Sequence, residues 1–224
     1  MPHPPPTTPR RSGLDHLVHP PMRADARRNY DALVAAADEV FTAHGPDASL
    51  DEIARRARVG NATLYRHFPD RRELLVAVCV GEVEALCVVG EELQADPDAG
   101  QALSNWLHAY IDHVSAKHGL AAAFATGRRD DSELVAACQS AVLGIGNSLL
   151  QRAQHQGAVR TDVNLPDIIT LVNAIAMASE TADARESDRM LAIVLAGIAA
   201  SGTARSHPPT QARRRQQKTA EQQA

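Results

Sequence analysis

The sequence predicts an all-α protein of about nine helices, in which an N-terminal three-helix unit is joined to a larger C-terminal helical domain. Three observations support this fold class. Apolar residues recur at three- and four-residue steps along most of the chain. No stretch shows the apolar–polar alternation of a half-buried strand. Serine, aspartate, glycine and proline residues stand where helices would begin and end.

The two ends of the chain lack this periodicity and are expected to be disordered. Residues 1–22 are rich in proline, and residues 203–224 are polar and basic. Between them we expect two domains, residues 23–70 and residues 71–202. The N-terminus lacks the apolar core of a signal sequence, and no uncharged apolar stretch is long enough to cross a membrane. A cytoplasmic protein without membrane contact is therefore expected.

The net charge of −4 is unevenly distributed along the chain. Residues 1–72 hold 11 arginines against 9 acidic residues, and residues 73–202 hold 7 basic against 17 acidic residues. The last segment, residues 203–224, holds 5 basic residues against 1 acidic residue. A polyanionic partner would therefore meet the ends of the chain rather than its acidic middle.

Helix boundaries in residues 23–70 are marked by caps and breakers. The first helix is expected to run for about 20 residues and to end before a Gly-Pro pair. Ser49 and Glu52 form a capping box that begins the second helix. After a short turn the third helix begins near Asn61, and Pro69 stops it because a proline ring cannot continue a helix interior. Three helices with this tight turn are the outline of a helix-turn-helix unit.

The second domain is expected to contain six more helices. Asp70 and Glu73 form another capping box, which begins a long helix that reaches Leu93. The others are expected near residues 99–118, 119–127, 131–156, 166–182 and 185–201. The last two are apolar on nearly every side, and helices of that kind are buried against other helices.

The third helix of the first domain carries an unusual concentration of hydrogen-bonding side chains. On a helical wheel Leu64 and Phe68 share the inward face, and Val59 supports the turn beneath them. The opposite face and its flanks then carry Asn61, Ala62, Thr63, Tyr65, Arg66 and His67. This set suits the DNA major groove, because alanine permits close approach, asparagine and arginine pair with base edges, and hydroxyl and imidazole groups donate to phosphates.

The segment "SLDEIARRARVGNATLYRHFPDRREL" resembles the DNA-binding segment of the tetracycline-repressor (TetR/AcrR-like) family of bacterial transcriptional regulators, through the shared pattern "IA..A.V...TLY.HF..R..L". A weaker similarity to the ligand-binding half of the family lies in "QGAVRTDVNLPDIITLV". The resemblance implies that some residues face base edges and others hold phosphates. The expected base contacts are Asn61, Ala62, Tyr65 and Arg66, and the expected phosphate contacts are Thr63, His67 and Arg71.

Two positions in the turn depart from the family pattern. Arg58 stands where the family usually has glycine, and Gly60 stands where it usually has a serine or threonine cap. Glycine caps a helix almost as well as serine. Arg58 is expected to need a positive φ, at a cost of roughly 1 kcal/mol, unless Gly60 absorbs the turn or Arg58 gains a phosphate contact.

The resemblance also implies a homodimer that binds a double-stranded DNA operator and is released by a small-molecule inducer of unknown chemistry. Residues 166–182 and 185–201 are the expected dimer helices, because a four-helix core with a second copy would cover them. Candidate pocket residues are Trp106, Tyr110, Phe124, Leu143 and Leu150, with ordinary core packing as the alternative.

The rest of the chain offers no pattern typical of an enzyme, a metal site or a cofactor site. Its three cysteines have neither disulfide nor zinc spacing, so we expect small buried side chains, with redox sensing as the alternative. The favoured function is a ligand-released repressor. The alternatives are a transcriptional activator on the same fold, and a helical ligand-binding or interaction protein whose helix-turn-helix is structural.

Overall fold

The computed structural model describes residues 14–21, 23–123, 129–178 and 184–200, and over these residues it confirms the all-α fold. A short 3-10 helix, η1 (Asp15–Leu17), precedes eight α-helices. In chain order these are α1 (Ala24–His44), α2 (Leu50–Arg56), α3 (Asn61–His67), α4 (Arg71–Leu93), α5 (Ala99–Ala123), α6 (Arg129–His155), α7 (Leu165–Ala178) and α8 (Ala184–Ile198).

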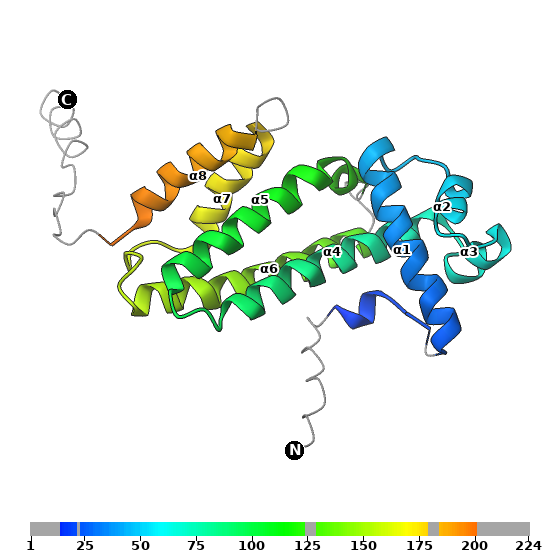
Figure 1. Ribbon diagram of the computed structural model, residues 1–224, viewed down its shortest axis with the longest axis horizontal. Helices are drawn as coiled ribbons and strands as arrows, with labels where there is room; N and C mark the ends of the chain where they lie inside the picture. Colours follow the sequence, from blue (N-terminus) through cyan, green and yellow to red (C-terminus); the bar gives the residue numbers. More distant parts are fainter. Residues whose placement is uncertain (1–13, 22, 124–128, 179–183, 201–224) are drawn as a thin grey trace, which may run out of the picture.

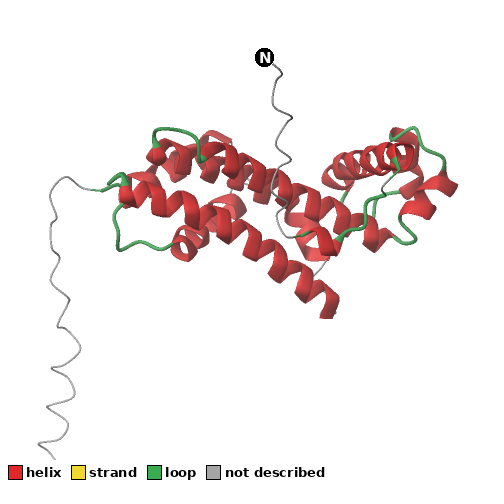
Figure 2. Cartoon of the chain, turned by 90° about the horizontal axis from the view of Figure 1, so that it is seen from below, coloured by secondary structure: helices red, strands yellow, loops and turns green. Residues whose placement is uncertain are grey.

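The helices form a small unit at one end of an elongated bundle (Figure 1). We call α1–α3 (residues 24–67) the head and α4–α8 (residues 71–198) the body. Helix α4 contacts α1 of the head as well as α5 and α6 of the body, so it joins the two parts. Figure 2 shows the same division in a second view, with the head at one end. Helix α4 is therefore an element that the head and the body share.

The predicted N-caps are confirmed at the start of α2 and α4, in the half of each capping box where the cap side chain accepts from the backbone. The Ser49 side chain accepts a hydrogen bond from the Glu52 amide at 3.4 Å, and the Asp70 side chain accepts one from the Glu73 amide at 2.9 Å. Each bond satisfies a backbone donor that has no partner within its own helix. The start of each helix is therefore encoded in the few residues around it.

Helix α5 is longer than predicted. A separate helix over residues 119–127 was expected, but residues 119–123 continue α5, and residues 124–127 lie outside the described part of the chain. The predicted boundary between the two helices falls at Gly119, which lies inside α5. A glycine in a helix interior costs only about 1 kcal/mol relative to alanine, and no proline follows to stop the helix.

The structure also differs from the disordered arm that was predicted for residues 1–22. Residues 15–17 form η1, and Leu14 is buried with only 2% of its surface exposed. Leu14, Leu17 and Val18 are spaced like one face of a helical turn, a pattern that the surrounding prolines obscure in an average over the segment. Residues 1–13 and 201–224 lie outside the described chain, so disorder there remains a prediction.

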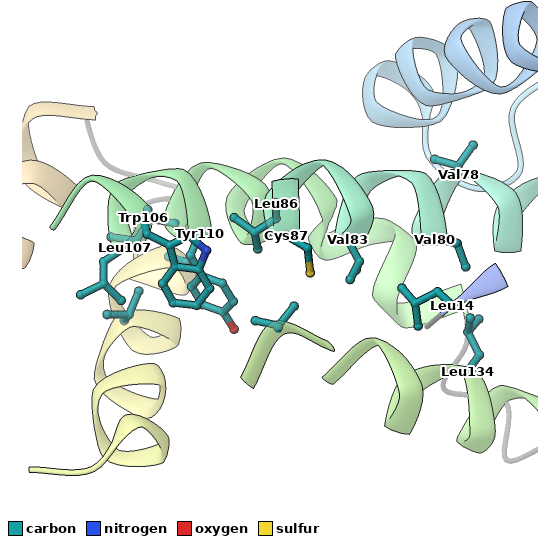
Figure 3. Close-up of a cluster of buried hydrophobic side chains, with 14 of the residues drawn as sticks. Leu14, Val78, Val80, Val83, Leu86, Cys87, Trp106, Leu107, Tyr110 and Leu134 are labelled. Atoms are coloured by element: carbon teal, nitrogen blue, oxygen red, sulfur yellow. The ribbon is translucent and has the colours of Figure 1, made fainter. Parts of the chain in front are cut away.

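The body core is packed most tightly around Trp106 of α5, which is fully buried. A Cβ added to Gly146 of α6 would lie 2.6 Å from Cη2 of the indole, and one added to Gly90 of α4 would lie 3.0 Å from Nε1. The absence of side chains at these two positions lets α4 and α6 approach the ring closely. Figure 3 shows Trp106 with Tyr110 in the cluster that continues along α4 through Cys87 and Val83.

Helix α6 is the one described helix that is long and apolar enough to cross a membrane by length and composition. It packs against α4, α5 and α7 in the bundle.

Candidate nucleic-acid interface

The turn between α2 and α3 is set by backbone hydrogen bonds and by a positive φ at Arg58. The Val59 amide donates to the Ala54 carbonyl at 2.9 Å, and the Arg58 amide donates to the Arg55 carbonyl at 3.1 Å. These two bonds are those of a Schellman motif, which normally has glycine in the left-handed position. Arg58 occupies that position with φ 57°, whereas Gly60 has an ordinary extended conformation with φ −69°. Gly60 therefore does not absorb the turn, and Arg58 carries the strain.

Two buried side chains anchor α3, as the helical wheel predicted. Leu64 and Phe68 are 1% and 2% exposed, and the Phe68 ring lies 4.9 Å from the ring of Tyr30 on α1. Burial raises the pKa of the Tyr30 hydroxyl above its ordinary value, so this ring stays neutral at physiological pH. The inward side of α3 is thus held by an aromatic contact with the first helix of the head.

The four expected base-contacting residues are all exposed on the outward face of α3. They are Asn61, Ala62, Tyr65 and Arg66. Tyr65 is 49% exposed, whereas Phe41 and Phe68 of the same domain are 1% and 2% exposed, so Tyr65 does not serve as a core residue. Exposure agrees with the prediction, while the contacts with bases remain a prediction.

Asn61 has a partner that the sequence analysis missed. Its Nδ2 donates to Oδ1 of Asp51 on α2 at 2.7 Å, so the amide is oriented across the turn. The amide oxygen and the second N–H proton stay available, because an asparagine amide has two donor protons and one acceptor oxygen. No sequence spacing marks this bond, since its partners belong to two different helices.

The three expected phosphate-contacting residues are less exposed than the base-contacting ones. Thr63 and His67 are half-buried, and the His67 ring meets the Tyr30 ring edge-on at 6.2 Å. Arg71 is also half-buried, and its Nη1 donates to the carbonyl of Pro46 at 3.0 Å and to the carbonyl of Ala48. Arg71 therefore holds the loop between α1 and α2, a role that the sequence did not indicate.

The predicted pocket residues divide into packed and partly accessible ones. Trp106 and Leu150 are 0% and 3% exposed, Leu143 is half-buried, and Phe124 lies outside the described residues. Tyr110 stacks on Trp106 at 5.8 Å and donates from its hydroxyl to Oδ1 of Asn173 on α7 at 2.9 Å. Trp106 is closely packed, but its indole N–H is a buried donor without a hydrogen-bond partner among the described residues, and the Tyr110–Asn173 pair places further polar atoms inside the bundle.

Cys87 is buried, as the sequence predicted, whereas Cys79 and Cys138 are half-buried. Burial raises the pKa of the thiols of Cys87 and Cys138 to about 11. A thiol with so high a pKa is protonated at physiological pH and reacts slowly with oxidants, because the thiolate is the reactive form. This disfavours the alternative of a redox sensor at Cys87 and Cys138.

A second exposed surface lies on α7 and α8 and is apolar. Leu171 and Met177 of α7 are 51% and 60% exposed, and Ile193 of α8 is 68% exposed. Small residues surround them, since Ala174, Ala192 and Ala196 are exposed as well. We call these six residues the α7–α8 face. Large aliphatic side chains gathered on one surface are typical of a contact between proteins.

Two protein-family models match separate parts of the chain. The model for bacterial regulatory proteins of the tetR family matches residues 33–78, which span most of the head and the start of α4. The model for the C-terminal domain of SbtR-like transcriptional regulators matches residues 98–200. Together they cover the helix-turn-helix and most of the body.

The chain is similar to the crystal structure of a TetR transcriptional regulator from Streptomyces coelicolor, at 36% identity and a TM-score of 0.65. That match covers 77% of this chain and 99% of the other. An uncharacterized HTH-type transcriptional regulator of Pseudomonas putida, TtgW, is 38% identical over 42% of this chain and 67% of its own length. The HTH-type transcriptional activator FasR of Mycolicibacterium smegmatis is 38% identical over 40% of this chain and 41% of its own length.

Proposed function

Because the chain belongs to the TetR family of bacterial transcriptional regulators, we propose that it is a homodimeric repressor that leaves its operator when a small molecule binds. Proteins of this family are regulators rather than enzymes, and they bind DNA as soluble dimers. A cytoplasmic location follows for a protein of this kind. The observation that carries the proposal is the exposed outward face of α3, anchored from behind by Leu64 and Phe68.

The outward face offers the chemistry that base recognition needs. Arg66 can donate two parallel hydrogen bonds to a guanine edge, and the free atoms of the Asn61 amide can pair with an adenine edge. Ala62 lets the helix approach closely and can contact a thymine methyl, while the Tyr65 hydroxyl can donate to a base or a phosphate. Thr63 and His67 flank this face and are proposed to hold phosphates.

The α7–α8 face is the proposed dimer contact. A second copy would cover the aliphatic side chains of both helices and form a four-helix core. The two recognition helices would then meet successive major grooves, about 34–36 Å apart along the duplex, and the operator would be a pseudo-palindrome.

Release by a ligand requires that binding in the body changes the separation of the two heads. Helix α4 is the proposed lever, because it contacts α1 in the head and α5 and α6 in the body. The polar pair of Tyr110 and Asn173 marks the proposed inducer site between α5 and α7. A ligand there would need an apolar body with a group that hydrogen-bonds to this pair.

The test is the ability of an Arg66→Ala variant to distinguish DNA sequences. The duplex is first selected from a random pool by the wild-type protein, and its affinity is then compared with that of a scrambled duplex by fluorescence anisotropy. Loss of a bidentate base contact is expected to reduce the discrimination by about 1–3 kcal/mol. Arg55→Ala removes an exposed arginine from α2 instead, and is expected to leave discrimination unchanged. Unchanged discrimination in Arg66→Ala would contradict base recognition by α3.

One alternative is activation instead of repression, and the name of the activator FasR favours it as the second candidate. Both functions use the same DNA-binding face. A reporter gene placed behind the selected operator distinguishes them, because expression rises on deletion of a repressor and falls on deletion of an activator.

The other alternative is an interaction protein whose helix-turn-helix is only structural. Binding to phosphates releases counterions, so the affinity of a DNA-binding protein falls steeply as salt rises. A gel shift at two salt concentrations therefore separates the two functions. Absence of salt-sensitive binding at micromolar protein would rule out the regulator.

A further inference from the structure

The segment that precedes α1 is packed against the junction of head and body. We call residues 14–20 the strap. It lies outside both regions matched by the family models, which are residues 33–78 and residues 98–200. Its 3-10 helix contacts α4, and its hydrophobic residues Leu14, Leu17 and Val18 belong to or border the continuous core.

The N-terminal end of the strap is anchored in the body. Leu14 is 2% exposed. Figure 3 places it in the same buried cluster as Val80 of α4 and Leu134 of α6. A leucine so completely buried has a strong preference for this position over water, so this end of the strap is held in place.

The other end of the strap faces the head across two cavities. Val18 and Tyr30 both line a cavity of about 500 Å³ between α1 and α4, and both also line a second cavity of about 260 Å³. Leu17 and His19 line the second cavity together with His67 and Phe68, the residues at the C-terminal end of α3. The Tyr30 ring, which shares both cavities with Val18, contacts the rings of both His67 and Phe68, so it connects this side of the head to the recognition helix.

An ion pair connects α4 and α6 at the same junction. Arg72, which also lines the second cavity, donates from Nε and Nη2 to Oδ1 of Asp131 at 3.0 and 2.6 Å. Asp131 is 3% exposed and lies one turn before Leu134, the neighbour of Leu14 in the cluster. Strap, α4 and α6 thus meet directly beneath the head.

We propose that the strap positions the recognition helix. Anchored at Leu14 beside Val80 and Leu134 of the body, it limits the movement of Tyr30, His67 and Phe68 across the cavities that they share with it, and thereby sets the orientation that the two heads of the dimer present to an operator. This role rests on the proposed function as a DNA-binding dimer. Specific binding needs both recognition helices at a fixed separation, whereas non-specific binding needs only positive charge near the phosphates. Loosening the strap therefore weakens specific binding selectively.

The experiment introduces Leu14→Ser into the full chain. It measures the affinity of this variant for the duplex selected by the wild type and for a scrambled duplex. Affinity for the selected duplex is expected to fall about tenfold, within the range usual for coupling between sites. Affinity for the scrambled duplex and the salt dependence are expected to stay as in the wild type. Leu14→Met, which keeps the apolar anchor, is expected to restore the affinity for the selected duplex.

A control separates positioning from general loss of stability. Leu149→Ala removes a fully buried leucine from the far part of α6, and is expected to lower the melting temperature without selective loss of operator affinity. A selective loss in Leu149→Ala equal to that in Leu14→Ser would overturn the proposal, because any destabilisation would then produce the effect.

A second control tests whether the N-terminal segment instead acts through its charges. If Arg10→Ala with Arg11→Ala reproduces the selective loss seen in Leu14→Ser, the arginines rather than the strap are responsible, and the proposal is overturned. Unchanged affinity of Leu14→Ser for a duplex that the wild type does select overturns the strap proposal alone. If the wild type selects no duplex, the proposed function itself is wrong, and the strap proposal falls with it.

Discussion

The head and the body each expose a surface, but the chemistry of the two surfaces is opposite. The outward face of α3 carries side chains that form hydrogen bonds, with Tyr65 49% exposed. The α7–α8 face carries aliphatic side chains, with Ile193 68% exposed. Polar side chains remain well solvated until a partner offers matching hydrogen bonds, whereas aliphatic side chains gain free energy from any partner that removes water. This difference supports the proposal that DNA binds the first surface and a second copy of the protein binds the second.

The largest effect is expected from placing a charge on the α7–α8 face. Ile193→Asp combined with Leu171→Asp would require burial of unpaired carboxylates in a dimer contact, so the protein is expected to be monomeric by light scattering. Loss of the second DNA-binding site is expected to weaken operator binding at least about 100-fold. Val135→Asp is the matched control, because Val135 is an exposed aliphatic residue of α6 outside this face. A dimer that survives both aspartates would show that the contact lies elsewhere.

A smaller effect is expected from the two glycines of α6. A methyl group at Gly146 would lie 2.6 Å from Trp106 and 2.8 Å from Leu165, so Gly146→Ala is expected to lower the free energy of unfolding by about 1–3 kcal/mol. Gly144 faces open space, so Gly144→Ala is expected to raise it by about 0.5–1 kcal/mol through helix propensity. Urea unfolding of both variants measures the contrast. Equal effects at the two positions would contradict the close packing around Trp106.

The smallest effect is expected in the turn of the head. Arg58 has a positive φ, so Arg58→Gly is expected to stabilise the head by up to about 1 kcal/mol. Arg55→Gly, in helical conformation three residues earlier, is expected to destabilise it by a similar amount, about 1 kcal/mol. Thermal unfolding measures both. Destabilisation by Arg58→Gly would mean that the arginine side chain makes a contact worth more than the strain.

Sequence reasoning was most successful where structure depends on neighbouring residues. The caps at Ser49 and Asp70 and the inward face of Leu64 and Phe68 follow from the spacing of a few residues. The positive φ at Arg58 was expected from the resemblance to the family, in which glycine usually stands at this position. The helical fold class and the family followed from the same local patterns, and both are confirmed.

Contacts between residues distant in the chain could not be predicted in this way. The bond from Arg71 to the Pro46 carbonyl spans 25 positions, and the ion pair of Arg72 and Asp131 spans 59. No periodicity indicates such pairs, because they depend on how the helices pack. The strap was missed for a related reason, since its three hydrophobic residues are too few to stand out from their proline-rich surroundings.

Trp106 also has a consequence for spectroscopy. It is the only tryptophan of the chain, and it lies in the body, fully buried between Gly90 and Gly146. Indole fluorescence therefore reports on the body alone, while the head contains only tyrosine and phenylalanine rings. A titration that shifts the emission spectrum would identify an effector of the body without any need to know the operator.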